Sequence, residues 1–80
     1  MEDITFVLKR DGTPLYTQVY QHIAGEIHRG NLKEGTRLPS KRALVKHLKI
    51  SMSTVESAYD LLLSEGYIRS EQKKGFYVQG

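Results

Sequence analysis

Apolar side chains recur at helical spacing in the first third of the chain. Four of them repeat every four residues, at Leu15, Val19, Ile23 and Ile27. This spacing places them along one side of an amphipathic helix. Thr13 and Pro14 are the residue types expected at an N-cap and at the first helical position, and Gly30 at the C-terminal stop. The pattern predicts a helix from Pro14 to about Arg29.

Two further helices are predicted between Ser40 and Gly66, joined by a short turn. The first would be capped by Ser40 and end near Leu48, with an apolar face formed by Leu44, Val45 and Leu48. The second carries the i, i+3, i+4, i+7 stripe of a half-buried helix, at Val55, Ala58, Tyr59 and Leu62. Ser53 and Glu56 have the spacing of a capping box, which predicts that this helix starts at Ser53.

The opposite face of that last helix is polar and rich in small hydroxyl groups. It presents Ser53, Ser57, Asp60 and Ser64, with Thr54 and Glu56 on its flanks. A helix with such a start suits insertion into a major groove, and two helices joined by a short turn match the helix-turn-helix motif. The positive end of the helix dipole and its free amides also favour phosphate.

A β-hairpin is predicted after Gly66. Tyr67–Ser70 and Phe76–Val78 are β-prone runs, and Glu71–Gly75 between them is a basic loop with glycine at its end. Three helices followed by a hairpin predict a mainly α fold with a small β-hairpin, the winged helix-turn-helix. Upstream, Pro39 favours extended geometry at Arg37–Leu38, which leaves room for a short strand there.

The domain organisation follows from this order. Residues 1–12 are expected to form an N-terminal arm or short strand, because Ile4, Phe6 and Leu8 alternate with other residues. Residues 13–80 are expected to form the winged helix-turn-helix domain. With 80 residues, the chain has no room for a catalytic domain beside a binding domain.

Charge points to a polyanionic partner. The formal net charge is +3, and the segment from Lys33 to Lys49 holds six Lys or Arg residues against one acid. Such a local excess fits nucleic acid, whereas the alternative is a solvated charged surface. The absence of cysteine excludes disulfides and thiolate metal sites and fits a reducing cytoplasm. No run is long enough for a membrane span.

No residue pattern indicates catalysis or metal binding. His22, His28 and His47 are scattered and lack the spacing of a zinc site. Ser, His and Asp residues are present without an arrangement that orders a nucleophile, a base and an orienting group. Gly30 and Gly35 read as turns rather than as a phosphate-binding loop. We therefore expect no enzyme activity and no cofactor in this chain.

Four motifs in sequence order resemble the DNA-binding domain of the GntR family of bacterial transcription regulators. They are Pro14-Leu15-Tyr16-x-Gln18-Val19, Gly30-x-Leu32-x-x-Gly35-x-x-Leu38-Pro39-Ser40-x-Arg42, Ser53-Thr54-Val55-x-x-Ala58-Tyr59 and Glu65-Gly66-Tyr67-Ile68. The resemblance covers roughly residues 14 to 78. Ala58-Tyr59, Glu65-Gly66-Tyr67 and Lys74–Val78 look most like the MocR branch, especially GabR-type regulators. The short YtrA-like branch is the alternative.

The resemblance implies binding of double-stranded operator DNA as a homodimer. The recognition helix, about 53–65, would enter the major groove and the wing, about 67–79, would lie at the adjacent minor groove. By position, Arg42 corresponds to the family's arginine on the second helix and Gly75 to its wing-tip glycine. The predicted DNA-binding residues are Lys41, Arg42, Ser51, Met52, Ser53, Thr54, Ser57, Lys73, Lys74 and Gly75.

The sequence departs from the family pattern at two of these positions. Met52 stands where the family usually has arginine, and Glu56 where a basic residue is common. A methionine can contact a thymine methyl group and a glutamate can accept from cytosine N4, so the family's base preference does not transfer.

The resemblance also suggests a longer protein. A MocR-type regulator carries a C-terminal aminotransferase-like domain, which would bind pyridoxal phosphate. The isolated domain is then expected to be monomeric or weakly dimeric. The rival hypothesis is a winged helix that serves as a protein-interaction or assembly module and does not bind DNA.

Overall fold

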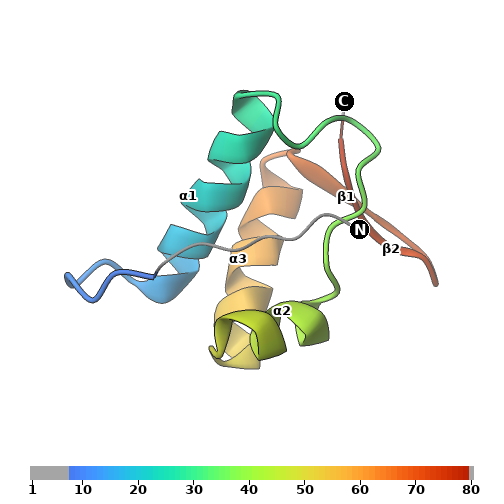
Figure 1. The fold of residues 1–80 in the computed structure, drawn as a ribbon. Coiled ribbons are helices and arrows are strands. Elements are labelled where there is room, and N and C mark those ends of the chain that lie inside the picture. The colour runs from blue at the N-terminus through green and yellow to red at the C-terminus, as the bar shows by residue number, and fades with distance from the viewer. Residues whose placement is uncertain (1–7, 80) are drawn as a thin grey trace.

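The computed structural model describes residues 8–79 and shows a winged helix fold (Figure 1). Its helices are α1 (Leu15–His28), α2 (Lys41–Leu48) and α3 (Met52–Ser64), and its hairpin consists of β1 (Ile68–Glu71) and β2 (Gly75–Val78). α1 and α3 lie side by side, and α2 packs against the beginning of α3. The predicted order of three helices and a hairpin is therefore confirmed.

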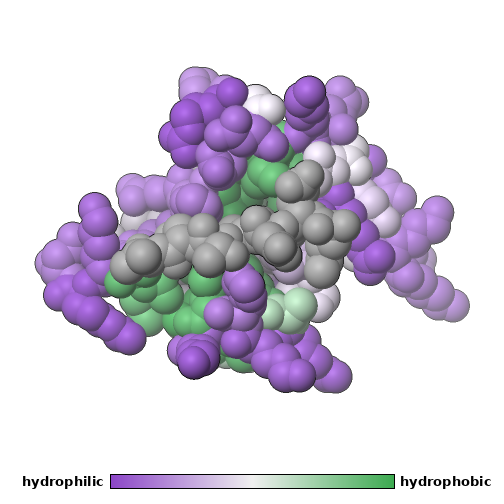
Figure 2. All heavy atoms as spheres, in the orientation of Figure 1, coloured by the Kyte–Doolittle hydropathy of each residue, from purple (hydrophilic) through white to green (hydrophobic). Residues whose placement is uncertain are grey.

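The core lies where the apolar stripes meet. Val19 and Ile23 from α1, Leu44 from α2 and the four stripe residues of α3 are all buried. Ile68 and Val78 close the core from the hairpin. On the face seen in Figure 2, hydrophobic residues are visible between projecting hydrophilic side chains. No helix of the described residues is long and apolar enough to cross a membrane.

The connector between α1 and α2 is held to the wing by backbone hydrogen bonds. Arg37 forms an isolated antiparallel bridge with Tyr77, and the Leu38 amide donates to the Phe76 carbonyl at 2.8 Å. The Val78 amide donates to the Thr36 carbonyl at 2.9 Å. The short strand predicted at Arg37–Leu38 is thus reduced to a single bridge at Arg37. It gives the two-stranded hairpin a third backbone partner and fixes the wing to the helical body.

Tyr59 joins the recognition helix to both neighbouring elements. Its ring is fully buried, and its hydroxyl donates to the Pro39 carbonyl at 2.7 Å. The same ring meets Phe76 of β2 edge-to-face, with 5.1 Å between centroids. Burial raises the pKa of Tyr59, which keeps the hydroxyl protonated as a donor. One side chain of α3 therefore contacts the residue before the N-cap of α2 and the second strand of the wing.

The start of α1 differs from the prediction. The helix begins at Leu15, so Pro14 is the N-cap and Thr13 lies outside the helix. Pro14 has extended backbone (φ −54°, ψ 141°) and so cannot be the first helical residue, and the Asp11 carboxylate accepts the Thr13 amide at 3.1 Å in a turn before it. The Gln18 side chain closes this turn by donating to the Thr13 carbonyl at 2.9 Å.

The N-terminal arm can be judged only in part. Ile4 and Phe6 of the predicted strand lie outside the described residues. Residues 8–10 carry no strand, and Gln18 holds the backbone of Lys9 through two hydrogen bonds of 2.7 and 2.8 Å. Leu8 is half-buried against the core. This part of the arm therefore lies on α1.

Replacing Tyr59 with phenylalanine should destabilise the domain by about 1–3 kcal/mol, because the buried Pro39 carbonyl loses its donor. Urea unfolding monitored by circular dichroism measures this change. Tyr16→Phe is the matched control, since Tyr16 is 40% exposed. Equal stability of the two variants would show that the Tyr59 hydroxyl does not hold the junction together.

Candidate nucleic-acid interface

The recognition helix starts earlier than its sequence suggests. Ser51 is the N-cap of α3, with extended backbone (φ −72°, ψ 155°), and its side chain accepts the Thr54 amide at 3.2 Å. The predicted capping box of Ser53 and Glu56 is therefore wrong. Ile50 and Val55 are both buried and flank the cap at the N′ and N4 positions of a hydrophobic staple. This apolar pair favours Ser51 over Ser53 as the N-cap of α3.

The N-terminal turn of α3 gathers a cluster of hydroxyl groups. Ser51 Oγ lies 2.8 Å from Thr54 Oγ1 and 3.2 Å from Ser53 Oγ. Ser51 and Ser53 are exposed, whereas Thr54 is half-buried. Met52 projects among them with 38% of its surface exposed. Because the first amides of a helix have no acceptor within it, this turn presents both N–H donors and rotatable hydroxyls to solvent.

The positive charges predicted on α2 lie in two different environments. Arg42 is exposed, and no carboxylate of the described residues lies within ion-pair distance of it. Lys41 is half-buried, and its Nζ lies 5.4 Å from the centroid of the Phe76 ring. That contact is a cation–π geometry, which holds the ammonium group at the junction of α2 and the wing. Arg42 is thus available to a ligand, while Lys41 also has a packing role.

The tip of the wing is the turn formed by residues 72–74. Lys73 and Lys74 are exposed there, and the Lys74 amide donates to the Glu71 carbonyl at 3.0 Å. Lys73 takes the left-handed conformation at φ 64°, a position where glycine is usual. Gly75 is paired with Glu71 as the first residue of β2. The glycine therefore lies at the base of the turn rather than at its tip.

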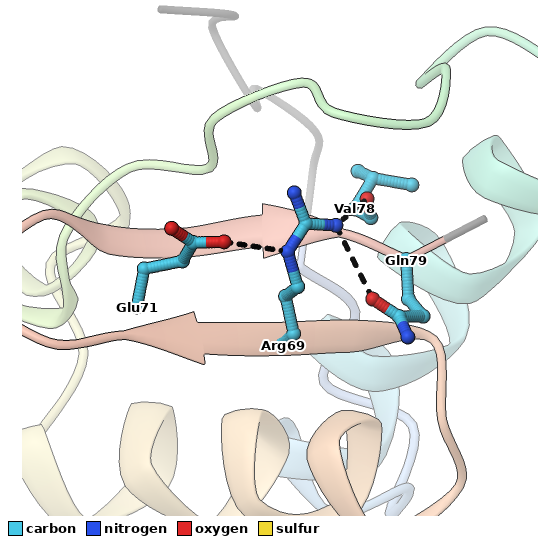
Figure 3. A network of polar contacts seen from close by, with 4 residues as sticks. All are labelled: Arg69, Glu71, Val78 and Gln79. Carbon is cyan, nitrogen blue, oxygen red and sulfur yellow. Dashed lines mark hydrogen bonds and ion pairs between the residues drawn. The ribbon is translucent and has the colours of Figure 1, made fainter.

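Arg69 links the two strands of the wing through its side chain (Figure 3). Its Nε donates to Glu71 Oε2 at 2.8 Å, and its Nη1 donates to the Val78 carbonyl at 3.1 Å and to Gln79 Oε1 at 3.2 Å. The hydrogen bond from Arg69 holds the pKa of the Glu71 carboxyl below its usual value. The Arg69 guanidinium is therefore occupied by contacts within the hairpin. Lys73 and Lys74 in the turn are the cations of the hairpin that can contact a ligand.

Comparison with known proteins identifies the family. The model of the gntR family of bacterial regulatory proteins matches residues 15–78, nearly the whole chain. This chain belongs to the GntR family. The resemblance drawn from the sequence motifs is therefore confirmed.

Individual relatives agree with this assignment. The chain is 42% identical over 73 residues to the probable rhizopine catabolism regulatory protein MocR of Rhizobium meliloti, covering 90% of this chain and 15% of that protein. It is similar in structure to YtrA from Sulfolobus acidocaldarius, a GntR-family transcription factor, with TM-score 0.81, 39% identity and coverage of 89% and 74%. The AraR DNA-binding domain, solved with operator ORX1, gives TM-score 0.78, 27% identity and coverage of 94% and 90%.

The curated relatives are much longer than this chain. The chain spans only 15–17% of the length of three of them. The GntR domain described here therefore corresponds to a small part of those regulators.

Two residues of this GntR domain were missed as site candidates. No functional role was predicted for Tyr16, which is 40% exposed. It lines an open depression against the outer face of α3, together with Ser57, Asp60, Leu61 and Ser64. The sequence could have indicated this exposure, because Tyr16 does not belong to the four-residue apolar repeat that faces the core. Arg37 was predicted only as part of the basic segment and of a short strand, and its position beside Gly75 depends on the tertiary fold.

Ser51→Ala should destabilise the GntR domain by about 1 kcal/mol, because the Thr54 amide loses its cap. Ser53→Ala should leave stability nearly unchanged, since Ser53 lies within the first turn of α3. Thermal unfolding measures the stability of both variants, which carry the same serine-to-alanine change at positions two residues apart. A larger loss for Ser53→Ala would restore the capping box and contradict the helix start described here.

Proposed function

We propose that this GntR domain binds double-stranded operator DNA sequence-specifically, as the DNA-binding part of a bacterial transcription regulator. The observation that carries the proposal is the start of α3, where the hydroxyls of Ser51 and Ser53 and the first amides of the helix face solvent. The AraR domain of the same fold was solved on its operator, which supports a DNA partner for this arrangement.

The first turns of α3 would enter the major groove. Met52 and Ser53 occupy the first two helical positions, so their amides lie at the positive end of the helix dipole. The hydroxyls of Ser51 and Ser53 extend this donor set toward phosphates. Contacts of this kind set the position of the helix on the duplex without reading sequence.

Bases would be read by other side chains of the first two turns of α3. Thr54 and Ser57 can hydrogen-bond to base edges, and the exposed thioether of Met52 suits a thymine methyl group. Glu56 is exposed on the same helix and suits cytosine N4, which is a donor. We propose that Met52 and Glu56 give this regulator a base preference different from relatives with arginine there.

Cations on two sides of α3 would hold the duplex. Arg42 on α2 reaches phosphate or guanine, and Lys41 adds charge beside it. Lys73 and Lys74 at the wing tip would lie at the adjacent minor groove, with Gly75 at the base of their turn. These contacts favour any duplex, so they contribute affinity and salt dependence more than specificity.

The long relatives suggest the setting of this domain. We propose that it acts in the cytoplasm within a homodimeric, effector-responsive regulator, and that the isolated domain is monomeric or weakly dimeric. The similarity to MocR favours a following aminotransferase-like domain, in which pyridoxal phosphate would bind. Similarity to YtrA keeps the shorter branch as the alternative.

Selection of bound duplexes from a random pool tests the proposal directly. We expect enrichment of one sequence with two half-sites whose centres lie about ten base pairs apart, or a multiple of that spacing. A domain that enriches no sequence and shows no salt-sensitive shift with duplex DNA would instead fit the protein-interaction hypothesis.

Arg42→Ala should weaken binding to the selected operator by about 1–3 kcal/mol, because a charged contact to phosphate or guanine is lost. Fluorescence anisotropy with labelled operator measures the change. Arg29→Ala is the matched control, since Arg29 is also exposed but pairs with Glu26 at 2.8 Å at the end of α1. Unaltered affinity of the Arg42 variant would remove it from the interface.

Substitutions at Thr54 and Lys74 should have different consequences. Thr54→Ala is expected to change which base is preferred at one operator position, because Thr54 would face a base edge. Lys74→Ala is expected to weaken binding to all duplexes alike and to reduce the salt dependence, because it would contact the backbone. Repeating the random-pool selection and a salt titration with both variants measures this division. The opposite pattern would reverse their roles.

A further inference from the structure

The wing carries a second arginine on its outer face, contributed by the connector between α1 and α2. Arg37 is paired with Tyr77, and Tyr77 is paired with Arg69 on its other side. Directly paired residues point to the same face of a sheet. Arg37, Tyr77 and Arg69 therefore share the face that turns away from the core.

The Arg37 side chain runs along this face toward the tip of the wing. A Cβ placed on Gly75 would lie 3.3 Å from Arg37 Nε and 3.5 Å from Arg37 Nη2. The guanidinium thus rests against the first residue of β2, next to the turn of residues 72–74. The glycine leaves the space that the arginine uses.

The two arginines on this face differ in their partners. Arg69 is bound to Glu71, to Gln79 and to a backbone carbonyl, and its guanidinium lies 5.6 Å from the Tyr77 ring centroid. Arg37 is exposed, and no carboxylate of the described residues lies within ion-pair distance of it. Its charge and its fork of donors are therefore available to a ligand.

Cations approach the wing tip from both faces of the hairpin. Lys41 lies over Phe76 on the inner side, Arg37 lies against Gly75 on the outer side, and Lys73 and Lys74 form the turn between them. Three separate segments of the chain bring these charges together. Such convergence creates a local positive potential that two turn lysines alone would not supply.

We propose that Arg37 is a further DNA contact, which binds backbone phosphate at the edge of the minor groove beside the wing. This inference rests on the proposed function and extends the interface to the connector. A planar guanidinium binds phosphate through two parallel donors, so Arg37 would fix the position of the wing on the duplex as well as add charge.

Salt titrations of operator binding test the inference. Arg37→Ala and Arg37→Gln should both weaken binding to operator and to unrelated duplexes, and each should reduce the slope of log K against log salt by about 1. Arg37→Gln keeps most of the stem against Gly75, so it separates charge from packing. Arg37→Lys should retain the slope, because it keeps the charge.

Lys33→Ala is the matched control. Lys33 is an exposed cation of the same connector, but it precedes Gly35, whose amide donates to Val78 at the far end of the hairpin from the tip. It should leave both affinity and slope unchanged. An equal effect of Lys33→Ala would mean that the connector contributes only diffuse charge and would overturn a specific role for Arg37.

The outcomes separate this inference from the function on which it rests. Arg37 variants that bind like the parent, while Arg42→Ala binds more weakly, would overturn the Arg37 contact and leave the proposed function intact. A parent domain without salt-sensitive binding to any duplex would overturn both. Circular dichroism of each variant shows whether its fold is retained.

Discussion

The fold of this GntR domain depends on the junction at Tyr59. The residue belongs to the buried stripe of α3, yet its hydroxyl contacts Pro39 before α2 and its ring contacts Phe76 of the wing. One side chain therefore holds together α3, the start of α2 and the wing, the three elements that would meet DNA. Because Tyr59 has no exposed surface, the junction is sheltered from solvent and keeps the spacing between recognition helix and wing.

The two faces of α3 divide stability from recognition. Val55, Ala58, Tyr59 and Leu62 supply the core, and the hydroxyl-rich turn at Ser51–Thr54 stays at the surface. The wing repeats the division with its two arginines. Arg69 holds the hairpin together through Glu71 and Gln79, whereas Arg37 stands beside Gly75 with its charge available. The core residues are thus distinct from the groups offered to a ligand, although Ser51 also caps α3 and Lys41 also packs on Phe76.

Local patterns in the sequence predicted the elements of the fold. The four-residue repeat from Leu15 and the stripe from Val55 describe single helices, and the β-prone runs around Lys73 describe a hairpin, so each depends only on nearby residues. The predicted cap of α2 is also confirmed, because the Ser40 side chain accepts the Ala43 amide at 3.1 Å.

The predictions that were wrong or incomplete concern the starts of two helices and the position of Arg37. They depend on competition between neighbouring residues or on contacts with distant parts of the chain. Ser51 and Ser53 are equally good caps by residue type, and the burial of Ile50 decided between them. Thr13 is not the N-cap because the backbone of Pro14 is extended and the helix starts one residue later, at Leu15. The position of Arg37 arises from a bridge to Tyr77, forty residues later in the chain, and no local pattern signals it. The predicted set of DNA-binding residues stays a prediction, although the structure gathers most of it around α3 and the wing tip.

The central claim is that the start of α3 and the tip of the wing meet one duplex together. Titration of the ¹⁵N-labelled domain with selected operator, followed by NMR, tests this most directly. We predict that the largest amide shifts fall in 51–57 and 72–76, together with Arg37 and Arg42. Shifts concentrated instead around Tyr20, Gly25 and His28 of α1 would contradict the account, because that face carries neither element.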